Sequence, residues 1–230
     1  MHTKHSQIRA RARQLLDDNI FGNDWIKGAL FQFLLDLFTV AIGVGLFPLT
    51  SLIIVNLVNL VGDKSIILVY AIPVIFYFFD LLLLFIIIGP FRVGSAAVYT
   101  DLVRNGDGVK IHKFFYGFKN FFANFILGVM YVIQVSLWSV FFVIPGIYVA
   151  YSYALVFHVK RDHPEYSWKY CFDESERLMD GKRFKLFKLQ ISHLGWFIVG
   201  GAFLGVGMYW AEPYLETSVA LFYEEAKASR

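Results

Sequence analysis

Long apolar stretches alternate with short polar segments along almost the whole chain. Long runs cover residues 28–47, 65–89, 121–144 and 186–210, and shorter ones cover 49–60, 147–158 and 214–223. About 20 residues at a rise of about 1.5 Å each cross the hydrocarbon core of a membrane, so runs of this kind predict transmembrane helices. The pattern predicts an all-α polytopic transmembrane helical bundle of about six spans, several of them short or broken by proline.

Prolines stand where these runs meet or end. They are Pro48, Pro90, Pro145 and Pro213. Proline has no backbone donor and disfavours helix in the residue before it, so we expect each of them to break or kink a helix. Runs and prolines together form a weak repeat of roughly 40 residues, a feature of some transporters. Structural bundles show such repeats as often, so the repeat alone does not indicate transport.

Two further segments have the pattern of amphipathic helices beside the membrane. In residues 5–20, apolar side chains recur at helical spacing while arginines occupy the other faces. This segment is either a membrane-surface anchor or a lead-in packed on the bundle. In residues 163–185, one helix face carries Trp168, Cys171, Phe172, Ser175, Leu178 and Met179. We expect this helix to lie at the cytoplasmic interface and to end at Gly181.

The composition agrees with a membrane protein and excludes an ordinary soluble domain. Hydrophobic residues make up 57% of the chain and charged residues 17%, whereas soluble domains are about half apolar and about a quarter charged. The net charge of +3 is too small to indicate nucleic acid as a partner. The lipid bilayer is the expected partner, with a protein partner or a second copy of the chain as further options. The single cysteine, Cys171, excludes an intrachain disulfide.

We therefore expect one integral membrane domain over residues 1–230, with a lead-in over 1–27, a bundle over 28–225 and a cytoplasmic insertion over 159–185. Lysine and arginine are frequent in the lead-in, between 90 and 120, between 159 and 188, and in the tail. Cytoplasmic loops carry an excess of these residues. Six crossings place all these segments on one side, opposite Lys64, which predicts a multi-pass protein of the cell membrane with both termini in the cytoplasm. If the chain turned back at Pro48 instead, Lys64 would join the basic side and Arg92 would be the exception.

Two carboxylates lie inside apolar runs, Asp36 and Asp80. Charge at bilayer depth is costly, so such residues usually face the interior of a bundle and often mark an ion or substrate path. The other interpretation is a hydrogen-bonded residue that fixes helix packing. Arg92 follows the Gly-Pro pair at 89–90 and is a candidate ion-pair partner for either carboxylate. Glu212 and Glu216 flank Pro213, and we expect them at the outer interface in water.

The sequence contains none of the motifs expected of an enzyme. It has no G-x-S-x-G elbow, P-loop or H-E-x-x-H motif, and its cysteine and histidines do not have zinc-site spacing. His193 is more readily explained as a hydrogen-bonded histidine than as a proton relay. We therefore expect no catalytic residues, no metal and no cofactor.

Several short sequences, taken in their order, resemble a known family. They are Ala12-Arg13-Gln14-Leu15-Leu16 ahead of Trp25, Gly89-Pro90-Phe91-Arg92-Val93-Gly94, Tyr99-Thr100-Asp101-Leu102-Val103-Arg104-Asn105-Gly106, Gly117-Phe118-Lys119-Asn120-Phe121, Ile144-Pro145-Gly146-Ile147, Glu174-Ser175-Glu176-Arg177-Leu178-Met179-Asp180-Gly181, Gly195-Trp196-Phe197 and Pro213-Tyr214. Together they resemble the bacterial integral membrane family catalogued as domain of unknown function 975, over nearly the whole chain. They are more distantly similar to the membrane domain found ahead of some glycerophosphodiester phosphodiesterases. The family has no established activity, so the resemblance implies a fold and a membrane location rather than a reaction.

Two functions remain open at this point. The first is a non-catalytic membrane protein that assists transport or envelope processes, either by moving a small or lipid-like substrate or by supporting an exporter. The second is a structural or regulatory membrane scaffold whose basic cytoplasmic face binds a partner or anionic lipid. A transporter requires a polar cavity that contains Asp36, Asp80 or Arg92, whereas a scaffold requires closed packing around them and a basic cytoplasmic surface.

Overall fold

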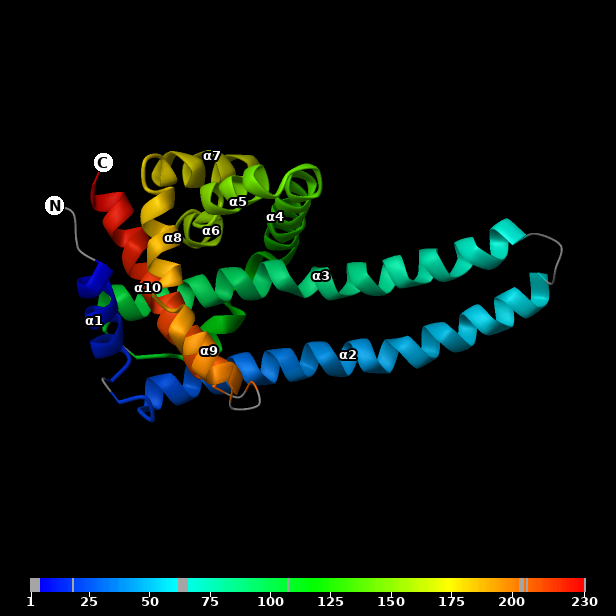
Figure 1. Ribbon diagram of the computed structural model, residues 1–230, viewed down its shortest axis with the longest axis horizontal. Coiled ribbons are helices and arrows are strands. Elements are labelled where there is room, and N and C mark those ends of the chain that lie inside the picture. The colour runs from blue at the N-terminus through cyan, green and yellow to red at the C-terminus, as the bar shows by residue number, and fades with distance from the viewer. Residues whose placement is uncertain are drawn as a thin grey trace.

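The computed structural model describes residues 5–17, 19–61, 66–106, 108–202, 205 and 207–229, and the regular elements among these are all helices (Figure 1). In chain order they are α1 (His5–Leu15), α2 (Asn23–Val61), α3 (Ile66–Asn105), the 3-10 helix η2 (Ile111–Asn120), α4 (Phe121–Phe141), α5 (Val143–Ser152), α6 (Val156–Asp162), α7 (Trp168–Met179), α8 (Arg183–Ile191), α9 (Leu194–Ala202) and α10 (Met208–Ala228). The predicted all-α fold is confirmed.

Helices α2 and α3 are the longest and form two arms that run side by side away from the other helices (Figure 1). The remaining helices gather around the end where α2 begins and α3 finishes. At that end α10 packs against both arms, and α1 packs against α10. The first and last helices of the chain therefore lie together, beside the base of the two arms.

The structure corrects three of the predicted helix breaks. α2 continues through Pro48, α3 through Pro90 and α10 through Pro213. One proline removes a single backbone hydrogen bond, whereas a chain that left the helix in apolar surroundings would leave several backbone groups without partners. Continuing the helix is the less costly arrangement where helix-forming sequence stands on both sides of the proline.

The predicted break at Pro145 lies slightly earlier, at Phe142. α4 ends there because Phe142 has an extended backbone, with φ −153° and ψ 127°. Pro145 then stands in the first turn of α5, where its missing N–H has no intrahelical partner to lose. The predicted short span over 147–158 is in turn shared between α5 and α6.

The apolar run over 186–210 is not one helix, as the sequence pattern suggested. It is divided among α8, α9 and the start of α10. One of the turns between them contains Gly205 with φ +79°, a left-handed conformation that glycine adopts without steric cost. Apolar character alone therefore did not reveal where this run changes direction.

Both predicted amphipathic segments form helices with one buried face, while their position at a membrane interface stays a prediction. The buried side chains of α1 include Ile8 and Ala12. Those of α7 are Cys171, Phe172, Ser175, Leu178 and Met179, on the predicted face. Gly181 follows the end of α7 with φ +66°, the conformation typical of a glycine after a helix C-terminus. Because α1 packs against α10, the structure favours the lead-in packed on the bundle over the membrane-surface anchor.

The second half of α3 lies very close to η2 and α4, and glycines allow this contact. A Cβ atom at Gly94 would overlap the carbonyl oxygen of Phe114 in η2, and one at Gly117 would overlap the carbonyl oxygen of Pro90 in α3. Gly89 faces the backbone of α4 in the same way. Two backbones approach this closely only where small residues stand between them. The position of η2 along α3 therefore depends on these glycines.

Two stretches of the described residues are long and apolar enough to cross a membrane by length and composition, Ile111–Val140 and Val143–Asp162. A shorter apolar helical segment covers Pro48–Leu60. Large apolar side chains of α2, α4 and α5 are also exposed, among them Leu52, Val140 and Ile144. Soluble proteins rarely expose large contiguous apolar patches. These features indicate membrane association, with fewer candidate spans among the described residues than the six predicted.

We expect Gly94→Ala to destabilise the protein, because the added methyl group overlaps the backbone of η2 and forces the two elements apart. Overpacking of this kind costs about 1–3 kcal/mol, and alanine recovers at most about 1 kcal/mol through its better helix propensity. Thermal unfolding of the purified protein in detergent measures the difference.

The matched control is Gly195→Ala in α9. The structure describes no heavy atom near the position that its Cβ would occupy, so this variant should be as stable as the parent or slightly more so. Equal stability of Gly94→Ala and Gly195→Ala would show that α3 and η2 are not in backbone contact.

Candidate functional site

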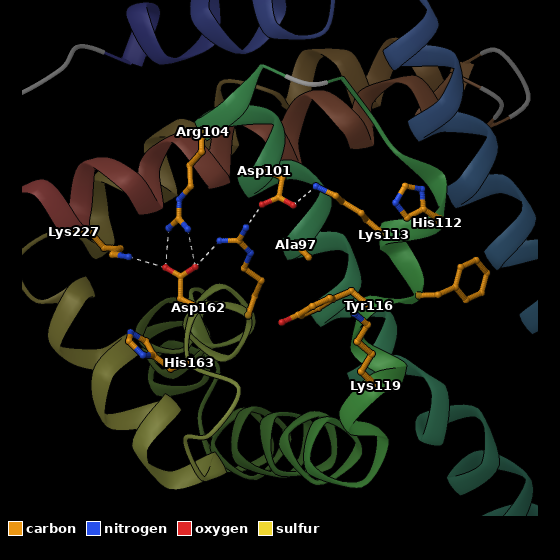
Figure 2. Close-up of a pocket in the computed structure, with 12 residues that line it drawn as sticks. Ala97, Asp101, Arg104, His112, Lys113, Tyr116, Lys119, Asp162, His163 and Lys227 are labelled. Atoms are coloured by element: carbon orange, nitrogen blue, oxygen red, sulfur yellow. Dashed lines mark hydrogen bonds and ion pairs between the residues drawn. The ribbon is translucent and has the colours of Figure 1, made fainter.

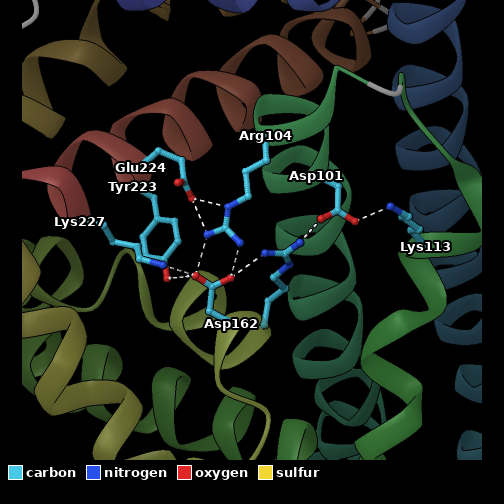
Figure 3. Close-up of polar contacts among 8 residues, drawn as sticks. Asp101, Arg104, Lys113, Asp162, Tyr223, Glu224 and Lys227 are labelled. Carbon is cyan, nitrogen blue, oxygen red and sulfur yellow. Dashed lines mark hydrogen bonds and ion pairs between the residues drawn. The ribbon is translucent and has the colours of Figure 1, made fainter.

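One buried carboxylate joins three helices near the end of α10 (Figure 3). Asp162 ends α6, and its side chain is 6% exposed. Arg104 of α3 binds both carboxylate oxygens, with Nη1–Oδ1 at 3.0 Å and Nη2–Oδ2 at 2.7 Å. Lys227 and Tyr223 of α10 donate to Oδ2 at 2.6 Å and 2.8 Å. Asp162 therefore connects α3, α6 and α10 through charge-assisted hydrogen bonds, which are stronger than neutral ones.

A second carboxylate extends the network to η2 (Figure 3). Arg161 donates to Asp162 Oδ1 at 2.6 Å and also donates to Asp101 Oδ1 in α3. Lys113 of η2 donates to Asp101 Oδ2 at 2.5 Å. Cations and carboxylates thus alternate in one continuous chain of contacts from η2 through α3 and α6 to α10.

These groups line an open space of about 790 Å³, which we call the charged cleft (Figure 2). Its walls also include His112, Tyr116 and Lys119 of η2 and His163 after α6. The ammonium group of Lys119 lies 5.4 Å from the centroid of the Tyr116 ring. Among the described residues that line the cleft, five are lysine or arginine and two are aspartate. The cleft therefore carries an excess of positive charge.

A second polar region lies farther along the same helices and contains two of the predicted site residues. Arg92 of α3, Asp36 of α2, and Glu212 and Glu216 of α10 line one hollow of about 290 Å³. Gln32 Nε2 donates a hydrogen bond to Asp36 Oδ1 at 3.1 Å. Three carboxylates and one guanidinium group thus line a single space between three helices.

Two neighbouring hollows share residues with this one. A hollow of about 340 Å³ shares its arginine and both glutamates and reaches Tyr151 of α5 and Gln190 of α8. Another, of about 510 Å³, shares Asp36 and Glu212 and extends to α9. Because neighbouring hollows have residues in common, they form a series across the bundle. We call the three together the polar cavity.

His158 of α6 lines the polar cavity with an imidazole ring that lacks hydrogen bonds. The residue is 4% exposed, and neither ring nitrogen has a partner among the described residues. Its nearest recorded ring contact is Tyr223, at 5.2 Å between centroids. Buried polar side chains nearly always have a partner.

The structure brings two of the three predicted path residues together. Asp36 and Arg92 line the same hollow, as the expected partnership between them requires. Asp80 lies on the same helix as Arg92 and twelve residues before it, a separation of about 18 Å along the axis at 1.5 Å per residue. The side chain of Asp80 lies outside the described residues.

Glu212 and Glu216 lie between helices. They were expected in water at the outer interface, but they line the polar cavity, because α10 continues through Pro213 and packs against α2 and α3. The sequence contained a signal that the two glutamates share one environment. Residues four apart lie on one face of a helix, so two carboxylates at this spacing within an otherwise helical segment indicate a shared environment.

The charged cleft was also missed as a site. Its cations were taken only as indicators of topology, although Asp101 and Arg104 belong to one of the short sequences that resemble the family. Their spacing of three residues places both on one helix face, which was the only local signal. The main partner, Asp162, stands 58 residues beyond Arg104, and no local pattern connects residues so far apart.

Two other residues that drew attention are satisfied core groups. His193 contacts the Leu189 carbonyl oxygen at 2.8 Å and Ser218 Oγ at 3.1 Å, as the simpler interpretation expected. Cys171 is buried on the inner face of α7, and burial raises the pKa of its thiol to about 11. Neither residue lines the cleft or the cavity.

We expect Asp162→Asn to destabilise the protein by about 3–5 kcal/mol, since it removes the buried carboxylate that three cations share. Arg104 keeps Glu224 and Arg161 keeps Asp101 as a partner, but the link between the three helices is lost. Glu224→Gln is the matched control: Glu224 accepts from Arg104 alone among the described contacts and is 31% exposed, so its loss should cost at most about 1 kcal/mol. Denaturation of both variants in detergent tests the difference. Equal costs would show that Asp162 does not hold the three helices together.

Comparison with known proteins gives one match. Residues 140–230 match the family model described as "Protein of unknown function (DUF975)". No curated protein and no solved structure matches the chain. The matched region covers α5 to α10 and so includes Asp162, His158 and both cavity glutamates. The more distant likeness to the membrane domain of glycerophosphodiester phosphodiesterases is not shown. Residues 140–230, which make up less than half of the chain, are thus similar to the family of unknown function DUF975.

Proposed function

We propose that the protein is a non-catalytic, multi-pass membrane protein that assists transport or envelope processes by holding a small or lipid-like molecule in the polar cavity. The observation that carries this proposal is the series of hollows between helices that share lining residues, among them one guanidinium group and three carboxylates. Alternatively, the protein supports an exporter and uses the same cavity to do so.

The charges of the cavity favour a ligand role over a packing role. Ionisable groups within a membrane are costly, and they usually face the interior of a bundle or a water-filled cavity. A packing role would place the groups in closed contact with one another, as in the Asp162 network. Here Asp36, Arg92, Glu212 and Glu216 border hollow space instead. These features support an occupant with polar groups of its own.

The walls of the cavity suggest the class of molecule. Aromatic and aliphatic side chains stand beside the charges, including Phe31, Leu35 and Phe91 in one hollow and Phe157 in the next. Ligand sites of this size are commonly apolar with a few placed polar groups. The lining suits an amphipathic molecule whose cationic or zwitterionic head faces the carboxylates while its apolar part contacts the rings.

The proposal includes six crossings and cytoplasmic termini. Continuity of α2 through Pro48 supports the count in which the lysine- and arginine-rich segments share one side of the membrane. In that arrangement the charged cleft faces the cytoplasm. Arg92 lies twelve residues before Arg104 on α3, which is about 18 Å along the axis, and this separation supports a polar cavity at membrane depth.

A second candidate function is the structural or regulatory scaffold with a basic cytoplasmic face. The excess of lysine and arginine in the charged cleft favours it. On this proposal the cleft, rather than the cavity, meets the partner or anionic lipid. The two functions use different residues and can therefore be tested separately.

Cysteine labelling in membranes tests the cavity. In a Cys171→Ala background, we expect Ser95→Cys to react with a water-soluble thiol reagent, because Ser95 lines the hollow that contains Arg92. Leu34→Cys is the matched control: Leu34 is 51% exposed on α2, but on this proposal it faces lipid and should stay unlabelled. The measurement is the labelling rate in intact membranes, and we expect a difference of tenfold or more between the two positions.

Two outcomes would count against the cavity proposal. Protection of both positions would show closed packing around Ser95 and favour the scaffold. Rapid labelling of both positions would show that this part of the bundle lies in water rather than at membrane depth.

Reporter fusions test the orientation. We expect a fluorescent protein fused after residue 230 to fold and fluoresce in bacterial cells, and an alkaline phosphatase fused at the same place to be inactive, because the basic segments retain this end in the cytoplasm. The opposite pattern is expected for fusions after Lys64. Active phosphatase at the C-terminus would overturn the proposed orientation.

A further inference from the structure

The charged cleft has more positive charge than its own carboxylates neutralise. Asp101 and Asp162 face five lysine and arginine side chains among the described lining residues. Like charges repel, so cations gather in one cleft only where something compensates them. The two aspartates pair with Arg104, Arg161, Lys113 and Lys227, and Glu224 also pairs with Arg104 (Figure 3). Lys119 and His112 lie on the η2 side (Figure 2).

The aspartates also position the cations that remain available to a ligand. Arg161 is held by both carboxylates, and Lys113 is held by Asp101 at 2.5 Å. A guanidinium group has five N–H donors and an ammonium group three, so each keeps donors beyond those used in these contacts. Side chains fixed in advance lose less entropy when a ligand binds.

Lys119 completes this set from the other side. It lies on the same element as Lys113, and its ammonium group stands over the Tyr116 ring at 5.4 Å. Its recorded contact is thus with a ring face, and no carboxylate is within ion-pair distance of it among the described residues. Three cations from two elements, η2 and α6, therefore border the same open space (Figure 2).

We propose that the charged cleft binds a phosphate group through Lys113, Lys119 and Arg161. Phosphate presents several strong acceptor oxygens and suits arginine and lysine donors that converge from different directions. Basic pockets between transmembrane helices on the cytoplasmic side are known sites for phosphate-bearing lipid heads. The phosphate comes either from an anionic lipid or from a soluble molecule. The inference extends the second candidate function and does not depend on the polar cavity.

Binding to the full-length protein in detergent tests the proposal with two probes. Native mass spectrometry compares the binding of phosphatidylglycerol with that of phosphatidylcholine, and thermal unfolding compares inorganic phosphate with chloride at equal ionic strength. We expect Lys119→Gln to weaken binding of the effective probe about tenfold, since hydrogen bonds to charged groups contribute about 1.5–3 kcal/mol. The double variant Lys113→Gln/Lys119→Gln should lose the preference for the anionic probe.

The matched control is Lys169→Gln, which removes one charge from the exposed face of α7 and does not line the cleft. It should bind like the parent protein. Lys119 is exposed, so its variant should fold, and its unfolding temperature without probe verifies this.

The outcomes distinguish a lipid phosphate from a soluble one and show which part of the proposal fails. A preference for phosphatidylglycerol that the cleft variants lose supports a lipid phosphate, whereas an effect of inorganic phosphate alone supports a soluble ligand at the same site. If the parent protein prefers phosphatidylglycerol and both cleft variants keep that preference, the basic face still binds lipid but the cleft assignment is wrong. If neither probe binds the parent protein, the phosphate site is overturned.

Discussion

The buried charge of Asp162 is the constraint on which this end of the protein depends. A carboxylate removed from water loses several kcal/mol of hydration unless cations and hydrogen-bond donors replace it. The chain supplies them from α3, from α6 itself and from α10, so these helices must meet at one point. Arg104 makes the requirement directional, because its planar fork matches the two carboxylate oxygens. Packing of apolar side chains alone would leave the helices freer to slide past one another.

Because α3 and α10 are held together at this point, the residues through which they face each other farther along are also fixed. Arg104 and Glu224 form an ion pair in the network. Arg92 and Glu212 each stand twelve residues earlier on the same two helices, a step of about 18 Å at 1.5 Å per residue. The two helices thus present an arginine and a glutamate to each other at two levels. Arg104 and Glu224 are in direct contact, whereas Arg92 and Glu212 border the polar cavity.

The sequence predicted best those elements that have a polar face and an apolar face. α1 and α7 were identified because water on one side imposes a helical period on the sequence. All buried residues of α7 lie on the predicted face, although Trp168 of that face is exposed. In the apolar runs that period is absent, since every face is apolar, and proline was the remaining signal. This signal was misleading at Pro48, Pro90 and Pro213. Proline destabilises a helix, but in apolar surroundings a chain that left the helix would be destabilised more, because its backbone groups would lack hydrogen-bond partners.

The site residues divide in the same way. Asp36 was singled out because charge within an apolar run is conspicuous and Arg92 because it follows the Gly-Pro pair at 89–90, and both line one hollow. The cleft was missed because its partners come from distant segments: Arg161 meets a carboxylate 60 residues away, and Glu224 meets an arginine 120 residues away. Each charged residue looks like an ordinary solvated group in its own segment. Only the packing of α3 against α6 and α10 makes them a network.

The glycine contact between α3 and η2 explains why the cleft stays open although its network is largely paired. Because Gly94 and Gly117 bring the two backbones together, η2 lies along α3 with Lys113 and Lys119 on the cleft side. Asp101 then bridges Lys113 to Arg161. Asp101 thus joins η2 to α6 at Lys113, while the positive charge of Lys119 stays uncompensated. Because cations repel one another, the walls of the cleft do not come together near Lys119. The carboxylates thus fix the shape of the cleft without cancelling its charge, and an anion is the group that supplies the missing compensation.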